Sequence, residues 1–133
     1  MPETLGIGHV TLTVSDVKRS AEFYNGVFDT QTVLDVVDQF GPFMAVASTT
    51  LVLGFRTHES TNRADAFDPT RVGLDHFAFL VADQAAIEAW ESRLDEQDVS
   101  HSGVFEDPNG ARHLNFRDPD GIALEFYLPA PQN

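Results

Sequence analysis

The sequence contains no cysteine and only one lysine, Lys18. Without cysteine, disulfides, zinc–thiolate sites and cysteine nucleophiles are excluded, so any metal ion must be held by histidine nitrogens and carboxylate oxygens. No apolar run is long enough to span a bilayer, and the first residues lack the basic segment followed by an apolar segment that is typical of a secretory leader. We therefore expect a cytoplasmic protein with no membrane partner.

Positive charge is scarce as well. The 133 residues include 8 basic and 21 acidic side chains, which gives a formal net charge of -13. Such a field repels phosphate backbones, so we expect no nucleic-acid partner. A solvated acidic surface, adaptation to high salt and attraction of a cationic ligand all account for the acidity, and composition does not separate the three.

Apolar material is sufficient for one domain. Hydrophobic residues make up 42% of the chain and aromatic residues 11%. A chain of this length and composition is typical of a single compact domain, residues 1–133, with one core.

The chain contains an internal repeat. The segment HVTLTVSDVKRSAEFYNGVFD, which starts at His9, aligns without gaps with HFAFLVADQAAIEAWESRLDE, which starts at His76. Each segment opens with histidine, alternates like a strand, reaches an aspartate and continues with helical spacing. Farther along, LVLGF at Leu51–Phe55 corresponds to IALEF at Ile122–Phe126. The repeat therefore predicts two similar modules.

Each module is predicted to be a strand, a helix and three strands, which gives an α+β fold of two βαβββ modules around a central cavity. Module 1 covers about 5–57, a polar connector covers 58–72, and module 2 covers about 73–128. The expected strands are 5–14, 30–37, 43–48 and 50–56 in module 1, and 73–81, 99–106, 111–117 and 122–128 in module 2. The helices are expected to start near Ser15 or Asp16 and after Asp83, because such side chains cap helix N-termini.

Strand alternation predicts which way the histidines point. Val10, Leu12 and Val14 form an apolar face, which leaves His9 on the opposite face. In the same way His76 lies opposite Phe77, and Glu125 lies opposite its apolar neighbours in the last strand. A single histidine on a strand is usually a hydrogen-bonded core residue. The matching places of these three residues in a repeat instead indicate a shared concave face.

Two histidines and one carboxylate are typical of a metal site with open positions. His9, His76 and Glu125 would form such a facial set, which suits Fe(II) or Mn and is also compatible with Ni or Zn. The identity of the divalent metal ion stays open.

The same motifs resemble the vicinal oxygen chelate superfamily, which includes glyoxalases, bleomycin-resistance proteins and extradiol dioxygenases. The resemblance rests on GHVTLTVSDVKRSAEFYNGVF from Gly8, LDHFAFLV from Leu74 and LNFRDPDGIALEFY from Leu114. It extends from about Leu5 to Leu128. It implies metal ligands on the first and last strands of each module, and His9, His76 and Glu125 occupy three of those four places.

The resemblance also has gaps. The fourth ligand position is Gly54, which has no side chain, so the chain departs from glyoxalase I-like enzymes. Three ligands are similar to the extradiol dioxygenases and the fosfomycin-modifying thiol transferases. Those enzymes usually carry a cavity-facing tyrosine where this chain has Asn115, so neither specific activity is carried over.

Five further residues are candidates for the site. His113 is a candidate acid or base because its ordinary pKa is near neutrality, and Tyr127 is a candidate hydrogen-bond donor to a substrate oxygen. Arg56 is a candidate to bind an anionic substrate. Asn115 and Phe43 are expected to line the pocket. The alternatives are a solvated strand end for His113, a rim position for Tyr127, a surface ion pair for Arg56 and core packing for Phe43.

Two functions follow as hypotheses. The first is a divalent-metal-dependent enzyme that binds adjacent oxygens of a small oxygen-rich organic substrate, in lyase, isomerase, thiol-transferase or dioxygenase chemistry. The second is a metal-free protein of the bleomycin-resistance type that sequesters a small, cationic molecule. The resemblance also implies a homodimer.

Overall fold

The computed structural model describes residues 1–132 and divides the chain into two compact units, Met1–Asp65 and Ala66–Asn133. The division falls within the predicted connector, 58–72. No helix among residues 1–132 is long and apolar enough to cross a membrane.

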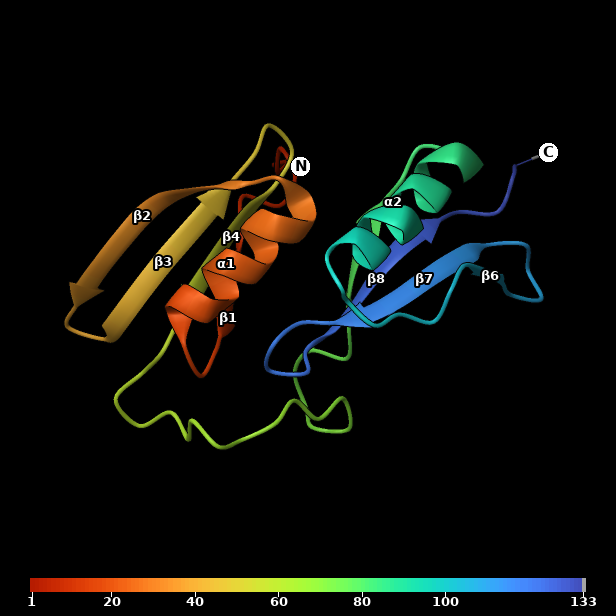
Figure 1. Ribbon diagram of the computed structural model, residues 1–133. Helices are drawn as coiled ribbons and strands as arrows, with labels where there is room; N and C mark the ends of the chain where they lie inside the picture. Colours follow the sequence, from red (N-terminus) through yellow and green to blue (C-terminus); the bar gives the residue numbers. More distant parts are fainter. Residues whose placement is uncertain (133) are drawn as a thin grey trace. The chain divides into compact units, whose positions relative to one another are not determined.

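Unit 1 has the predicted βαβββ order (Figure 1). Its elements are β1 (Val10–Thr13), α1 (Val17–Phe28), β2 (Gln31–Asp38), β3 (Gly41–Ala47) and β4 (Val52–Arg56). The strands form one sheet in the order β1-β4-β3-β2, in which β1 is parallel to β4 and the other neighbours are antiparallel. Asp16 caps α1 by accepting hydrogen bonds from the backbone N–H groups of Lys18 and Arg19.

Unit 2 repeats this order. Its elements are β5 (Phe77–Leu80), α2 (Gln84–Glu96), β6 (Phe105–Glu106), β7 (Arg112–Arg117) and β8 (Ala123–Leu128). The sheet order, β5-β8-β7-β6, is the same as in unit 1. The predicted α+β fold of two βαβββ modules is therefore confirmed.

The helix of each unit packs on its own sheet through an aromatic pair. Tyr24 of α1 stacks on Phe55 of β4, with ring centroids 5.0 Å apart, and Trp90 of α2 stacks on Phe126 of β8 at 4.4 Å. Phe55 and Phe126 occupy corresponding places in the two sheets, and both are buried. Burial of such large rings contributes on the order of 2–3 kcal/mol each to folding.

Three predicted strands are shorter than the sequence pattern indicates. β1 begins at Val10 instead of Leu5, and β5 begins at Phe77 instead of Gly73. The predicted strand 99–106 is reduced to Phe105–Glu106 and one isolated bridge at His101. Each shortened segment contains a glycine with positive φ, at Gly6, Gly73 and Gly103, and that conformation interrupts an extended strand.

Candidate metal and substrate site

Strand pairing is equivalent in the two sheets, so each residue of one half of the repeat can be matched with a residue of the other half. Gly54 in β4 is paired with Thr11 and Ala45, and Glu125 in β8 is paired with Ala78 and Asn115. Gly54 and Glu125 are thus the same position in the two units, as the sequence alignment predicts.

In unit 1 this position is closed. A Cβ atom built on Gly54 would lie 2.7 Å from Thr11 Oγ1 and 2.9 Å from Phe43 Cζ. The Phe43 ring therefore occupies the space that a ligand side chain would need. Phe43, predicted to line a pocket, is packed over the glycine.

Arg56 lies beside Phe43 and has carboxylate, carbonyl and aromatic partners. Its Nη1 donates to Asp38 Oδ1 at 2.6 Å and to the Gly41 carbonyl at 3.0 Å, and Nη2 donates to Asp38 Oδ2 at 3.0 Å. The guanidinium carbon also lies 4.7 Å from the centroid of the Phe43 ring. The hydrogen bond to Arg56 lowers the pKa of Asp38, and so does a further one from the Phe40 backbone N–H. The substrate-binding role of Arg56 stays a prediction.

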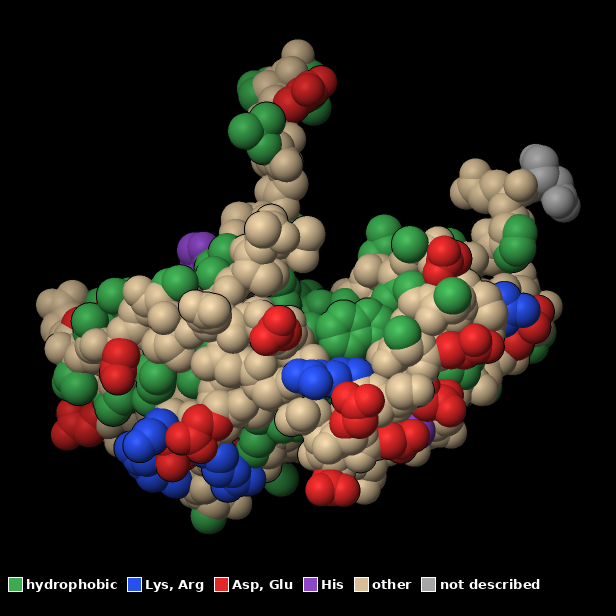
Figure 2. Space-filling model, turned by 45° about the horizontal axis from the view of Figure 1, so that its top comes forward, with side chains coloured by type: hydrophobic (Ala, Val, Ile, Leu, Met, Phe, Trp, Pro, Cys, Tyr) green, Lys and Arg blue, Asp and Glu red, His purple; other side chains and the backbone are tan. Residues whose placement is uncertain are grey.

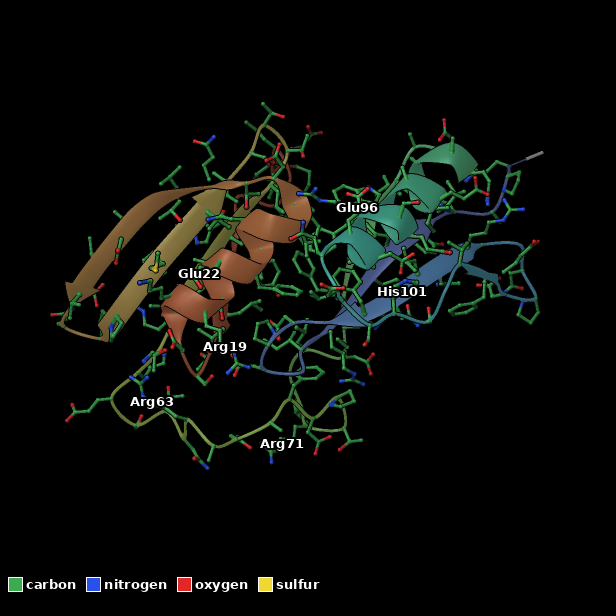
Figure 3. All side chains as sticks on the ribbon, in the orientation of Figure 1. Arg19, Glu22, Arg63, Arg71, Glu96 and His101 are labelled. Atoms are coloured by element: carbon green, nitrogen blue, oxygen red, sulfur yellow. The ribbon has the colours of Figure 1, made fainter. Side chains whose placement is uncertain are left out.

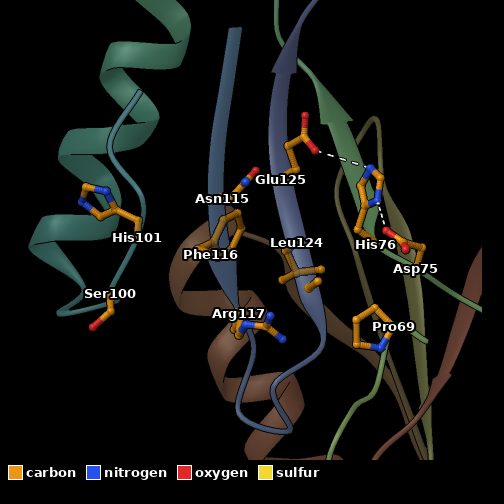
Figure 4. A pocket seen from close by; sticks show the side chains of 11 residues that line it. Pro69, Asp75, His76, Ser100, His101, Asn115, Phe116, Arg117, Leu124 and Glu125 are labelled. Carbon is orange, nitrogen blue, oxygen red and sulfur yellow. Dashed lines mark hydrogen bonds and ion pairs between the residues drawn. The ribbon is translucent and has the colours of Figure 1, made fainter. Parts of the chain in front are cut away.

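In unit 2 the equivalent position carries Glu125, and His76 lies next to it. The His76 Nε2 and Glu125 Oε2 atoms are 3.4 Å apart (Figure 4). Glu125 is only 8% exposed, although it is flanked by the apolar core residues Leu124 and Phe126. His76 directly precedes β5, on the side of the strand opposite Phe77, as alternation predicts. Two of the three predicted ligands are therefore brought together.

The other nitrogen of the His76 ring is also engaged. His76 Nδ1 lies 2.7 Å from Asp75 Oδ1, so its N–H donates to that carboxylate (Figure 4). The Nε2 atom is then the ring nitrogen on the side of Glu125. A carboxylate behind the ring is the usual support of a histidine that binds a metal ion, because it fixes the tautomer and the ring orientation.

His113 supports Glu125 from the other side. Its Nδ1 lies 2.5 Å from Glu125 Oε1, and its Nε2 lies 2.8 Å from Asp107 Oδ2. Two carboxylate acceptors on one ring favour its doubly protonated form, in which both nitrogens carry a donor N–H. Burial lowers the pKa of His113, but the hydrogen bonds to Asp107 and Glu125 outweigh it and raise the pKa above its ordinary value. The hydrogen bond from His113 in turn lowers the pKa of Asp107.

Tyr127 lies beside this chain of contacts. It is paired with His113 across β7 and β8, and the two rings are 5.5 Å apart. This contact corresponds to that between Phe43 and Arg56 in unit 1, since those two residues are paired in the same way across β3 and β4. The role of Tyr127 as a hydrogen-bond donor to substrate stays a prediction.

A cavity of about 670 Å³ opens over the pair of His76 and Glu125. Asn115 lines it, as the sequence predicts. His101, which lies between α2 and β6 (Figure 3), also lines it. Its Nε2 donates to Asp95 Oδ1 of α2 at 2.7 Å, while its Nδ1 accepts from the Gly103 backbone N–H. The remaining lining residues are Pro69, Asp75, Ser100, Phe116, Arg117, Ala123 and Leu124.

His9 belongs to unit 1 and precedes β1 as His76 precedes β5. No group of three or more histidine, aspartate or glutamate side chains that could hold a metal ion is formed among residues 1–132. His9 as the third ligand stays a prediction that rests on the repeat.

Sequence reasoning missed several residues of this site, among them Asp75, His101, Asp107 and Arg117. Asp75 adjoins a predicted ligand in the sequence, and that adjacency was an available signal. Asp107 begins an Asp-Pro-Asn-Gly turn, where it accepts hydrogen bonds from the backbones of Asn109 and Ala111. Its second oxygen reaches His113 only because the turn folds back on β7, which no local pattern predicts.

The model of the Glyoxalase/Bleomycin resistance protein/Dioxygenase superfamily matches residues 6–126. The chain belongs to this superfamily. The match covers both units, so each βαβββ module is part of the superfamily domain.

Superfamily members of known structure have the same fold. A glyoxylase/bleomycin resistance protein/dioxygenase domain from Frankia sp. EAN1pec is 30% identical, with a TM-score of 0.87 over 98% of this chain and 96% of the other. A lactoylglutathione lyase from Agrobacterium tumefaciens is 25% identical, with a TM-score of 0.72 over 96% of each chain.

A catechol-2,3-dioxygenase from Bacillus subtilis (strain 168) is 28% identical over 131 residues, which are 98% of this chain and 44% of that enzyme. The chain thus spans less than half the length of this relative. The three superfamily relatives carry different names, so family membership does not fix one reaction.

Proposed function

We propose that the protein is a divalent-metal-dependent enzyme that acts on a small oxygen-rich organic substrate. The observation that carries this proposal is the pairing of His76 Nε2 with the buried Glu125 Oε2, 3.4 Å apart over a cavity. Imidazole and carboxylate are suitable donors for Fe, Mn, Ni or Zn. His9, identified from the repeat, is the proposed third ligand.

Hydrogen bonds to neighbouring residues hold His76 and Glu125 in an orientation that suits a bound metal ion. Asp75 holds the N–H of His76 Nδ1, and His113 holds Glu125 Oε1. Each contact leaves one donor atom, Nε2 or Oε2, directed toward the other. A metal ion bound there would supply Lewis acidity for two adjacent substrate oxygens.

The other residues of the cavity would bind and orient the substrate. The Asn115 side chain offers an amide donor and an acceptor next to Glu125. Both ring nitrogens of His113 are engaged by carboxylates, which favours an orienting role over proton transfer to substrate. Tyr127 remains a candidate donor at the far side of Glu125.

Metal analysis of protein purified without a histidine tag tests the proposal. We expect about one Zn²⁺ or Mn²⁺ ion per chain by isothermal titration. Glu125→Gln and His76→Ala should abolish binding, because each removes one of two paired donors. His58→Ala is the matched control, since it deletes a histidine outside the site.

Two results together would overturn the proposal. These are less than one metal ion per chain and unchanged metal binding in His76→Ala. Binding of a small cation that chelator does not affect would instead favour the metal-free alternative, for which the acidic charge is the motivating observation. We also propose, from family resemblance, a homodimer, which light scattering would test.

A further inference from the structure

One arginine of the cavity has no acidic partner. Arg117, at the end of β7, lines the same cavity as His76 and Glu125. Within residues 1–132 it makes one hydrogen bond, from Nη1 to the Gly121 carbonyl at 2.7 Å. A guanidinium carries five N–H donors, so most of the donors of Arg117 lack a protein partner.

Two other arginines of this acidic chain, Arg56 and Arg112, are paired with carboxylates. Arg56 is bonded twice to Asp38, and Arg112 of the same strand lies 3.5 Å from Glu106. Of the carboxylates that line the cavity, Asp75 accepts from His76 and Glu125 accepts from His113, and neither is bonded to Arg117 among residues 1–132. The free donors of Arg117 therefore face a cavity in which the protein supplies no anion to them.

The sheet places Arg117 across β8 from His76. His113, Asn115 and Arg117 alternate with the buried Leu114 and Phe116, so these three share the face that bears Glu125. Arg117 is paired with Ala123, and the next pair of β7 and β8 residues on the same face joins Asn115 to Glu125. Figure 4 shows Arg117 and His76 on either side of β8.

The space between the two side chains suits a small molecule. Because β5 and β7 both adjoin β8, they are about 10 Å apart. The residue between them, Ala123, has a small side chain and lines the cavity. A substrate whose adjacent oxygens lie at His76 and Glu125 can thus extend over Ala123 toward Arg117.

We propose that Arg117 binds a carboxylate of the substrate, so that the substrate is a small organic acid with a pair of adjacent oxygens. This inference rests on the proposed function. A carboxylate matches the two parallel N–H groups of a guanidinium. A phosphate dianion is disfavoured, because the net charge of -13 and two carboxylates in the cavity repel it more strongly.

Two probes of nearly the same shape, one with a carboxylate and one with a neutral amide, test this inference. Both 3,4-dihydroxybenzoate and 3,4-dihydroxybenzamide present adjacent oxygens, but only the first carries a carboxylate. Each probe is titrated into the Zn²⁺-loaded full chain without oxygen. The benzoate should bind about ten- to hundred-fold more tightly than the benzamide, which is the gain in affinity that hydrogen bonds to a charged group usually give.

Variants then assign the preference to Arg117. Arg117→Gln should reduce the affinity ratio of the two probes to about one, and Arg117→Lys should retain part of it. Arg112→Gln, which removes an arginine of the same strand outside the cavity lining, should keep the ratio of the wild type.

The outcomes separate this inference from the proposed function. An unchanged ratio in Arg117→Gln, or no benzoate preference in a wild-type chain that binds Zn²⁺, overturns the role of Arg117 alone. Failure of the wild-type chain to bind Zn²⁺ overturns the proposed function and this inference with it.

Discussion

Five side chains of unit 2 form a continuous series of polar contacts. It runs from Asp75 through His76, Glu125 and His113 to Asp107. Carboxylates and imidazoles alternate along it, so each carboxylate of the series lies next to an imidazole ring. Removal of one member changes the charge and orientation of the next, because a partly buried polar group depends on its neighbours for its geometry.

Substitutions of His113 test its role at this scale. In His113→Asn the amide nitrogen occupies the place of Nδ1 and can still donate to Glu125. In His113→Gln it occupies the place of Nε2 and keeps only the contact with Asp107. We expect Mn²⁺ affinity close to that of the wild type for the Asn variant, and about 10–100-fold weaker for the Gln variant, by isothermal titration.

The comparison of the two amides excludes a general effect of the substitution. Each removes the imidazolium charge and shortens or straightens the side chain. Equal losses of Mn²⁺ affinity in both would contradict an orienting role through Nδ1, and equal retention would show that Glu125 needs no support from His113.

The sequence predicted that His76 and Glu125 lie close together and missed Asp75 and Asp107 at the two ends of the series. Strand alternation is a property of the backbone, so it correctly placed His76, Glu125 and Asn115 on one face. Asp107 acts across a turn, and Arg117 is distinguished by the absence of a carboxylate partner among residues 1–132. Such features depend on tertiary contacts, which no local pattern contains.

At the scale of elements, strands without a glycine at positive φ were predicted well. β4, β7 and β8 lie within two residues of their predicted bounds. The predicted strand 99–106 failed because Gly103 has φ of +72° and because Val104 donates its backbone N–H to Glu91 of α2 instead of to a strand. The hydrogen bond from Val104 to the Glu91 side chain thus takes the place of a strand-to-strand backbone hydrogen bond.

Gly54 tests how the corresponding strand of unit 1 is packed. Gly54→Ala adds a Cβ at 2.7 Å from Thr11 Oγ1 and 2.9 Å from Phe43 Cζ, so we expect about 1–3 kcal/mol loss of unfolding free energy in urea. Gly8→Ala is the control, because its added Cβ meets nothing within 4 Å. Phe43→Leu in the Gly54→Ala background should recover part of the loss of unfolding free energy. If the effects of the two substitutions simply add in the double variant, the contact between Phe43 and the added methyl group is contradicted.

The pairing of Asp38 with Arg56 ties the end of β2 to β4 and should respond to acid. The hydrogen bond from Arg56 lowers the pKa of Asp38 in the folded chain, so folding favours the ionised carboxylate. Its contribution is present above the ordinary aspartate pKa, about 3.9, and is lost as the pH falls through the lowered folded value.

Asp38→Asn isolates that contribution. We expect the wild type to melt above the variant at pH 6, and the difference in melting temperature to shrink below about pH 4, because the protonated acid then resembles the amide. A difference that stays constant from pH 6 to pH 2.5 would show that the charge of Asp38 is not involved.

Acidic charge is a property of the whole molecule. Acidic side chains are spread over the face drawn in Figure 2, as expected for a net charge of -13. Self-repulsion among them destabilises the folded chain, and salt reduces it because the Debye length falls from about 10 Å at 0.1 M to about 3 Å at 1 M. We therefore expect the melting temperature to rise between 0.1 and 1 M NaCl at pH 7.5.

A control separates screening from solvent effects. Sucrose at equal osmolality stabilises proteins through exclusion and leaves charges unscreened. The rise with NaCl should exceed the rise with sucrose. Equal rises would show that the acidity has no measurable cost to folding, and would remove adaptation to high salt as its explanation.

The proposed ligands also belong to different parts of the molecule, because His9 lies in unit 1 and His76 and Glu125 lie in unit 2. A ligand that binds only the folded chain stabilises it, by about 2.7 kcal/mol at one hundred times its dissociation constant.

If His9 is the third ligand, His9→Ala and the wild type should have the same melting temperature with chelator present. With Zn²⁺ added, the wild type should gain more melting temperature than His9→Ala, as scanning calorimetry would measure. An equal gain would confine the site to unit 2, whereas a smaller gain in His9→Ala would mean that metal binding joins residues of both halves of the repeat.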